Sequence, residues 1–126
     1  MPASRILVVD DQLIVRRVLS SLLVSQGYEV DTAEHGEQAM ERLLNGNYDA
    51  VVTDLIMPVM DGVRLLEWIQ GEADLKLPVV VFSGYAMEHN GMSDRLASLN
   101  VSAVLTKPLG VSSLADTLGT LISAHA

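Results

Sequence analysis

The feature that most constrains the fold is a regular alternation of short aliphatic runs with longer amphipathic stretches along the chain. Three runs are almost entirely apolar and rich in β-branched residues, as strands buried on both faces of a sheet are: Ile6–Val9, Val51–Thr53 and Val79–Phe82. Weaker runs at Tyr28–Thr32 and Ala103–Thr106 predict two further strands.

Helical spacing of apolar residues fills the intervals between these strands. The first helix is expected over 12–26, with Gly27 as its C-terminal stop and an apolar stripe made of Ile14, Val15, Val18, Leu19, Leu22 and Leu23. Four more helices are indicated around 39–44, 63–69, 92–99 and 111–122. Strict alternation with buried strands predicts a (βα)5 α/β fold, in which helices cover both faces of a five-stranded parallel sheet.

Composition narrows the class of protein. The 126 residues suit one compact domain, expected to span 1–126, and 49% hydrophobic residues exclude disorder as the default state. There is no cysteine, which excludes disulfides and thiolate metal sites. The formal net charge of −8 argues against direct nucleic-acid or anionic-membrane partners, and no signal peptide or spanning segment is recognisable. We therefore expect a cytoplasmic protein whose ligand is a cation or a basic surface.

Charged and polar residues follow four of the five predicted strands. Asp10 and Asp11 follow the first strand, Asp54 the third, Ser83 the fourth and Lys107 the fifth. Parallel sheets bind ligands at the carboxyl ends of their strands, so these side chains are expected at one edge. Three converging carboxylates repel one another unless a cation intervenes. The oxygen donors favour Mg²⁺, and the lack of His or Cys ligands argues against zinc.

The same segments carry a family resemblance. VVDD at 8–11, TDLIMPVMDG at 53–62, SG at 83–84 and TKP at 106–108 closely resemble the receiver domain of bacterial two-component response regulators, including chemotaxis regulators. The resemblance covers essentially the whole chain, with the motifs in the family's order. It implies a flavodoxin-like three-layer sandwich with strand order 2-1-3-4-5.

The resemblance also implies residue roles. Asp54 would accept a phosphoryl group from a phosphohistidine. Mg²⁺, or Mn²⁺ as an alternative, would be bound by Asp11, Asp54 and the backbone carbonyl of Ile56, with Asp10 assisting through water. The phosphoryl oxygens would be contacted by two further residues, Lys107 and Ser83.

The implied function is phosphorylation-controlled signalling rather than enzymatic turnover. The implied partners are a sensor histidine kinase or a histidine phosphotransfer protein, and then a downstream protein or an attached output domain. Phosphorylation would switch the protein-interaction surface. Many receivers carry an aromatic residue three positions before the lysine, but here Val104 occupies that position, so switching by ring rotation is not expected.

Two alternatives belong to other functional classes. A Mg²⁺-dependent phosphohydrolase of the haloacid-dehalogenase type would carry a second Asp two residues after the nucleophile, where this chain has Ile56. An unphosphorylated protein-binding pseudo-receiver would not need the complete acidic set. Asp61 is interpreted as structural and not as a metal ligand.

Overall fold

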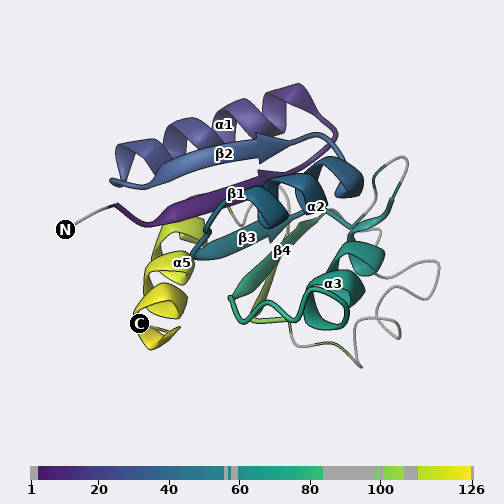
Figure 1. The fold of residues 1–126 in the computed structure, drawn as a ribbon. Coiled ribbons are helices and arrows are strands. Elements are labelled where there is room, and N and C mark those ends of the chain that lie inside the picture. The colour runs from purple at the N-terminus through teal and green to yellow at the C-terminus, as the bar shows by residue number, and fades with distance from the viewer. Residues whose placement is uncertain are drawn as a thin grey trace.

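The computed structural model describes residues 3–55, 57, 60–83, 99, 101–106 and 111–125, and at 83, 106, 111, 112 and 125 it describes the backbone alone. Strands and helices alternate through residues 5–83, and a further strand and helix lie within 103–125 (Figure 1). The strands are β1 (Arg5–Val9), β2 (Glu29–Ala33), β3 (Ala50–Thr53), β4 (Val79–Ser83) and β5 (Ala103–Thr106). The helices are α1 (Leu13–Ser25), α2 (Gly36–Asn45), α3 (Gly62–Gln70) and α5 (Val111–His125). The helix predicted around 92–99 falls outside the described residues, apart from Leu99, which packs against the core.

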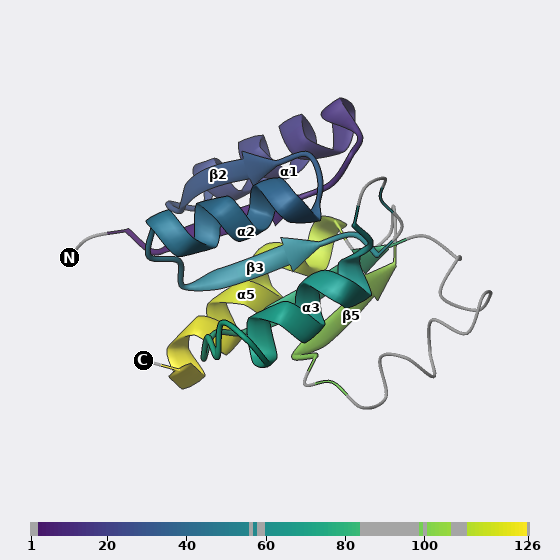
Figure 2. The ribbon, with the colours of Figure 1, turned by 45° about the vertical axis from the view of Figure 1, so that its right-hand side comes forward.

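The five strands form one parallel sheet in the order β2-β1-β3-β4-β5, which confirms the predicted fold class. The five parallel strands therefore end at the same edge of the sheet, as the arrows of β2 and β3, which flank β1, illustrate in Figure 2. Strand order reverses at β1, which pairs with β2 on one side and β3 on the other. That reversal is the place where open α/β sheets bind their ligands.

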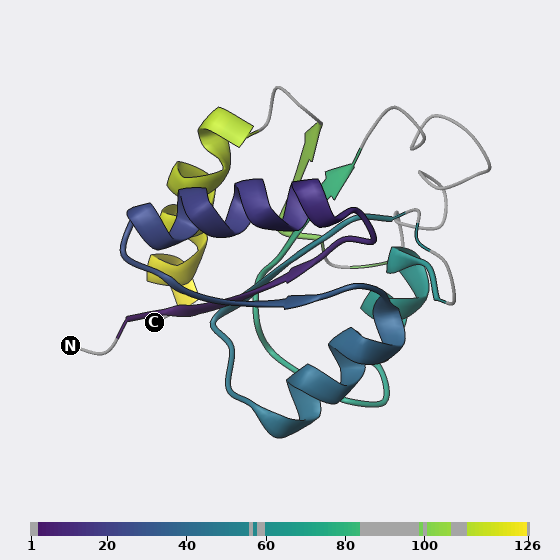
Figure 3. The ribbon, with the colours of Figure 1, turned by 90° about the horizontal axis from the view of Figure 1, so that it is seen from above.

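Helices cover both faces of the sheet and create two separate hydrophobic cores (Figure 3). On one face, α2 and α3 pack against Leu7, Val9 and Val51, and Trp68 lies partly buried at the margin of this core. On the other face, α1 and α5 pack against alternate strand residues such as Val8 and Val52. Because every residue of β3 is buried, this central strand is held from both sides.

The predicted apolar stripe of α1 is wider than the face that the sheet covers. Leu19 and Leu23 are buried, but the side chain of Ile14 is 76% exposed and Val18 is about half exposed. Ile14 and Val18 lie one turn apart on the flank of the helix, so periodicity alone could not separate them from the buried row. In α2 the same error affects Leu44, which is 70% exposed, whereas Ala39 and Leu43 are buried as expected.

The C-terminal end of α1 follows helix-capping chemistry. Gly27 adopts φ +96°, and the N–H groups of Gly27 and Tyr28 donate to the carbonyls of Val24 and Leu23. This is a Schellman motif, which confirms Gly27 as the stop signal. Because Tyr28 completes the helix end, β2 begins at Glu29, one residue later than predicted.

Within the described residues, no helix has both the length and the apolar character needed to cross a membrane.

Candidate functional site

Three carboxylates meet at the carboxyl edge of the sheet. Val9 at the end of β1 is paired with Thr53 at the end of β3, so the residues that follow, Asp10 and Asp54, leave the sheet side by side. One carboxylate oxygen from each of Asp10, Asp11 and Asp54 lies within 4.8 Å of the others. The structure thus brings together the three acidic residues that were predicted to converge.

Asp10 is held through its backbone and its side chain. It is 1% exposed. Its N–H donates to the carbonyl of Ala33 (3.1 Å), its own carbonyl accepts from Nη1 of Arg16 (2.8 Å), and its Oδ1 accepts from the N–H of Gln12 (2.9 Å). These bonds tie the turn after β1 to β2 and to the first turns of α1. Asp11, in contrast, is exposed at the mouth of the cluster.

Asp54 is 8% exposed and is equally constrained. Its N–H donates to the carbonyl of Val9 (3.0 Å), and its Oδ1 accepts from the N–H of Leu55 (2.7 Å). The hydroxyl of Thr53 donates to the Asp54 carbonyl (2.8 Å). The carboxylate therefore has a fixed orientation at the end of the central strand.

The start of α3 is packed directly against the backbone of Asp54. The N–H of Gly62 donates to the carbonyl of Leu55 (2.8 Å), and a Cβ built on Gly62 would lie 2.1 Å from the Asp54 carbonyl oxygen. Glycine is needed here because of this close approach. Asp61 caps α3 by accepting from the N–H of Arg64 (2.9 Å), which confirms its structural role.

Three other predicted site residues are described incompletely or not at all. The backbone of Ser83 lies at the end of β4, in register with Thr106 of β5. The Ser83 side chain, Lys107 and Ile56 lie outside the described residues. Val104, in place of the family's aromatic residue, is 46% exposed on β5.

Sequence reasoning missed two residues next to the cluster, Arg16 and Glu34. Nη2 of Arg16 lies 3.8 Å from a carboxylate oxygen of Glu34, the residue after β2. The Arg16 side chain is only 12% exposed. A signal was present in the sequence, since Arg16 stands three and seven residues before Leu19 and Leu23 and therefore shares their inward-facing row.

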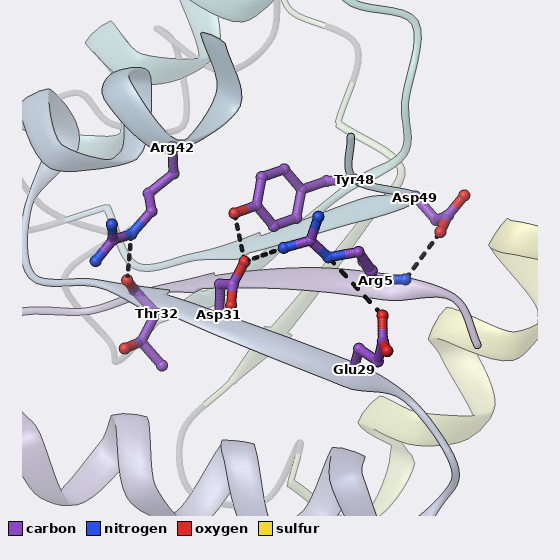
Figure 4. Close-up of polar contacts among 7 residues, drawn as sticks. All are labelled: Arg5, Glu29, Asp31, Thr32, Arg42, Tyr48 and Asp49. Carbon is purple, nitrogen blue, oxygen red and sulfur yellow. Dashed lines mark hydrogen bonds and ion pairs between the residues drawn. The ribbon is translucent and has the colours of Figure 1, made fainter. Parts of the chain in front are cut away.

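A second polar cluster lies toward the opposite edge of the sheet, where β1 and β3 begin (Figure 4). The carboxylate of Asp31 accepts hydrogen bonds from the hydroxyl of Tyr48 and the guanidinium of Arg5, and that guanidinium also lies 5.0 Å from the centre of the Tyr48 ring. The Tyr48 hydrogen bond, aided by Arg5, lowers the pKa of Asp31. Burial, together with the Asp31 carboxylate, raises the pKa of Tyr48 to about 12.

The chemistry of the Asp10–Asp11–Asp54 cluster suits a hard divalent cation. All three donors are carboxylates, and they come from two adjacent loops at the sheet's switch point. Mg²⁺ prefers oxygen ligands, takes one or two protein carboxylates and keeps further positions for water or phosphate oxygens. The residues present therefore fit this ion.

The family model of the response regulator receiver domain matches residues 6–119. The response regulator MprA of Mycobacterium sp. (strain KMS) is 36% identical over 112 residues, which cover 87% of this chain and 46% of MprA. The chain thus spans just under half the length of that curated relative.

Solved structures give the same result. The chemotaxis protein CheY4 of Vibrio cholerae superimposes with a TM-score of 0.84 and 25% identity, covering 95% of this chain and 99% of CheY4. The response regulator TrrA of Thermotoga maritima, solved in complex with Mg²⁺-BeF, gives a TM-score of 0.81 and 30% identity over 94% of this chain and 98% of TrrA.

Proposed function

The chain belongs to the response regulator receiver domain family, and we propose that Asp54 is its phosphoryl acceptor. Receiver domains are the signalling domains of two-component systems, which fixes the class of function. The proposed step transfers a phosphoryl group from an imidazole nitrogen of a partner's phosphohistidine to a carboxylate oxygen of Asp54. The P–N bond breaks, a P–O bond forms, and the histidine leaves as the free imidazole.

The burial and fixed orientation of Asp54 carry this assignment. Among the three clustered acids, Asp54 lies at the end of β3, the strand that both cores hold in place. Its carboxylate is oriented by the N–H of Leu55, so a nucleophilic oxygen can be presented with little rotational freedom. Asp10, at 1% exposed, is more deeply buried than Asp54, at 8%, and Asp11 is exposed.

Receiver domains bind Mg²⁺ at an acidic pocket. In this chain, we propose that Asp10, Asp11 and Asp54 hold the ion together with the backbone carbonyl of Ile56, and that Mn²⁺ can replace it. When bound, the ion would supply positive charge to offset the carboxylates and the incoming phosphoryl oxygens. The carboxylate-only donor set supports this proposal, as does the Mg²⁺-BeF complex of TrrA.

Two further residues complete the proposed site. Lys107 would pair with the phosphoryl oxygens, and the hydroxyl of Ser83 would donate to one of them. Ser83 ends the strand next to β3, and Lys107 follows the strand beyond it, which supports both assignments. These new contacts of Lys107 and Ser83 with the phosphoryl group would alter the protein-interaction surface. They would do so by shifting an equilibrium between two conformations of the domain.

The proposed partners follow from the receiver family. A sensor histidine kinase or a histidine phosphotransfer protein would supply the phosphoryl group. A downstream protein or an attached output domain would respond to it. We propose that residues 1–126 form a single receiver domain.

A phosphodonor assay tests this function. Incubation of the chain with acetyl phosphate and Mg²⁺ should give an acid-stable, base-labile label, and Asp54→Asn should remove it. Asp61→Asn is the matched control. It removes one carboxylate from the same loop, but that carboxylate caps α3 and does not belong to the Asp10–Asp11–Asp54 cluster. Wild-type labelling of Asp54→Asn would reject the assignment.

A further inference from the structure

Arg16 stands in an unusual position for a cation on a helix surface. Its side chain is only 12% exposed, and its two terminal nitrogens contact different loops. Nη1 donates to the carbonyl of Asp10 (2.8 Å), and Nη2 lies 3.8 Å from Glu34. A largely buried guanidinium is costly to desolvate, so these partners are needed to keep it there.

The contact with Asp10 reaches the candidate metal pocket through the backbone. The Asp10 peptide is held by Ala33 on one side and by Arg16 on the other, and its carboxylate is turned by the N–H of Gln12. If the Arg16 bond is lost, the Asp10 peptide loses one of the hydrogen bonds that hold the buried turn in place. The turn can then relax, and the carboxylates of Asp10 and Asp11 move with it.

We propose that Arg16 is a positioning residue for the cation site: its planar fork locks the turn after β1 to the loop after β2 and so preorganises Asp10 and Asp11. This inference rests on the proposed metal site. The fork geometry matters because a lysine has one ammonium nitrogen and cannot reach both partners from separate atoms. Arg16 does not touch the phosphoryl group in this account and is not a catalytic residue.

If Arg16 acts through its charge, its removal should change the Mg²⁺ affinity in the opposite direction from the change expected if it positions the ligands. A cation beside three carboxylates repels Mg²⁺, so an effect of charge alone would make binding tighter when Arg16 is removed. Loss of a residue that orients metal ligands weakens binding, by about tenfold or more in known sites. The sign of the change in Kd therefore separates the two roles.

The test measures Mg²⁺ affinity by calorimetry for the wild type, Arg16→Met, Arg16→Lys and Arg17→Met. Arg17 is the matched control, because it is the next residue of α1, it is exposed, and its loss changes the net charge equally. We expect both Arg16 variants to raise the Kd by about tenfold and Arg17→Met to leave it essentially unchanged. A Kd at or below the wild-type value in Arg16→Met, or full affinity in Arg16→Lys, would overturn the proposal.

A metal-free measurement guards against a purely structural effect. In the absence of Mg²⁺, the amide proton resonance of Gln12 should shift in the Arg16 variants, because its hydrogen bond to Asp10 reports the geometry of the turn. Arg17→Met should leave that resonance in place, and an unshifted resonance in both Arg16 variants would also overturn the proposal.

If Arg16→Met does not fold, Glu34→Gln supplies the test. It removes the other partner of the fork, and Glu37→Gln is its control, since that exposed residue lies nearby at the start of α2 and carries the same charge. We expect Glu34→Gln to weaken Mg²⁺ binding more than Glu37→Gln does, and equal effects would contradict the proposal. Absence of Mg²⁺ binding in the wild type would instead reject the metal site itself.

Discussion

At the scale of single residues, close packing around the Asp54 backbone determines the geometry of the candidate site. Thr53 donates to the Asp54 carbonyl, and Gly62 brings the α3 backbone within contact of the same oxygen. The loop therefore returns to the strand end with no room for a side chain at position 62. Asp61 then caps α3 immediately beside it.

Gly62→Ala should destabilise the protein by about 1–3 kcal/mol, because the added methyl overlaps backbone atoms that cannot move independently. Denaturant unfolding measures the loss. Gly119→Ala is the control, since its added methyl meets nothing closer than 3.5 Å and lies inside α5. That change should stabilise by about 1 kcal/mol through helix propensity. Equal effects of the two substitutions would contradict this account of Gly62.

Tyr48→Phe tests the hydrogen bond to Asp31 and its dependence on pH. The substitution should cost about 1 kcal/mol at neutral pH. The pKa of Tyr48 is raised from 10.0 to about 12, so its contribution is complete below pH 10 and is lost as pH rises toward 12. The pKa of Asp31 is lowered, so its contribution is lost as pH falls below its usual value of 3.8. Unfolding curves of both proteins should therefore converge above pH 10. A constant difference up to pH 12 would contradict this account of Tyr48.

The acidic residues of the site could be predicted from the sequence, and Arg16 could not with the signals we used. Asp10, Asp11 and Asp54 each follow a run of buried strand residues, and parallel strands must end at one edge. To predict that Arg16 faces inward, the rotational phase of the helix had to be known to within one residue. The apolar stripe was predicted too broadly, so the inward position of Arg16 was obscured.

At the scale of elements, helix ends were predicted more accurately than helix faces. Gly27 marks a local backbone conformation, which a single residue type can specify. Burial of a face depends on how the helix rests on the sheet, which local periodicity does not determine. This explains why Ile14, Val18 and Leu44 are exposed although they fit the apolar pattern. His35 is half-buried and caps α2, because its Nδ1 accepts from the N–H of Gln38.

Truncations in α1 should reveal which face is buried. Leu23→Ala should cost about 2–5 kcal/mol, because Leu23 is completely buried against the α1–α5 core. Ile14→Ala removes a similar side chain from the exposed flank and should change stability by no more than about 0.5 kcal/mol. Denaturant unfolding of the two variants compares them directly. A large loss in Ile14→Ala would mean that the flank is covered in the folded protein.

At the scale of the whole molecule, the surplus of negative charge has a local consequence. The net charge of −8 is spread over the chain, but three carboxylates are concentrated at one edge of the sheet. The alternating α/β fold and this convergence were predictable because alternation and parallel pairing leave few topologies, whereas the strand order followed from the family resemblance alone. Side-chain contacts between elements, such as Arg16 with Glu34, depend on packing that the sequence pattern does not encode.

Mg²⁺ should stabilise the folded chain by binding to the three carboxylates at this edge of the sheet. At a concentration of 100 Kd, a ligand that binds the native state alone adds about 2.7 kcal/mol to the free energy of unfolding. Thermal unfolding should therefore shift upward with Mg²⁺ and return on addition of a chelator. The shift should be lost in Asp11→Asn and absent with Na⁺ at matched ionic strength. An equal shift with Na⁺ would indicate general screening instead.

The central claim, that Asp54 accepts the phosphoryl group, is tested most directly by mapping the modified residue. The chain would be phosphorylated with acetyl phosphate and Mg²⁺, the acyl phosphate reduced with borohydride, and the peptides sequenced by mass spectrometry. We predict that the reduced residue is Asp54 and that no reduced residue appears when Mg²⁺ is chelated. Reduction at Asp10, at Asp11 or at an acid outside the cluster would contradict the account.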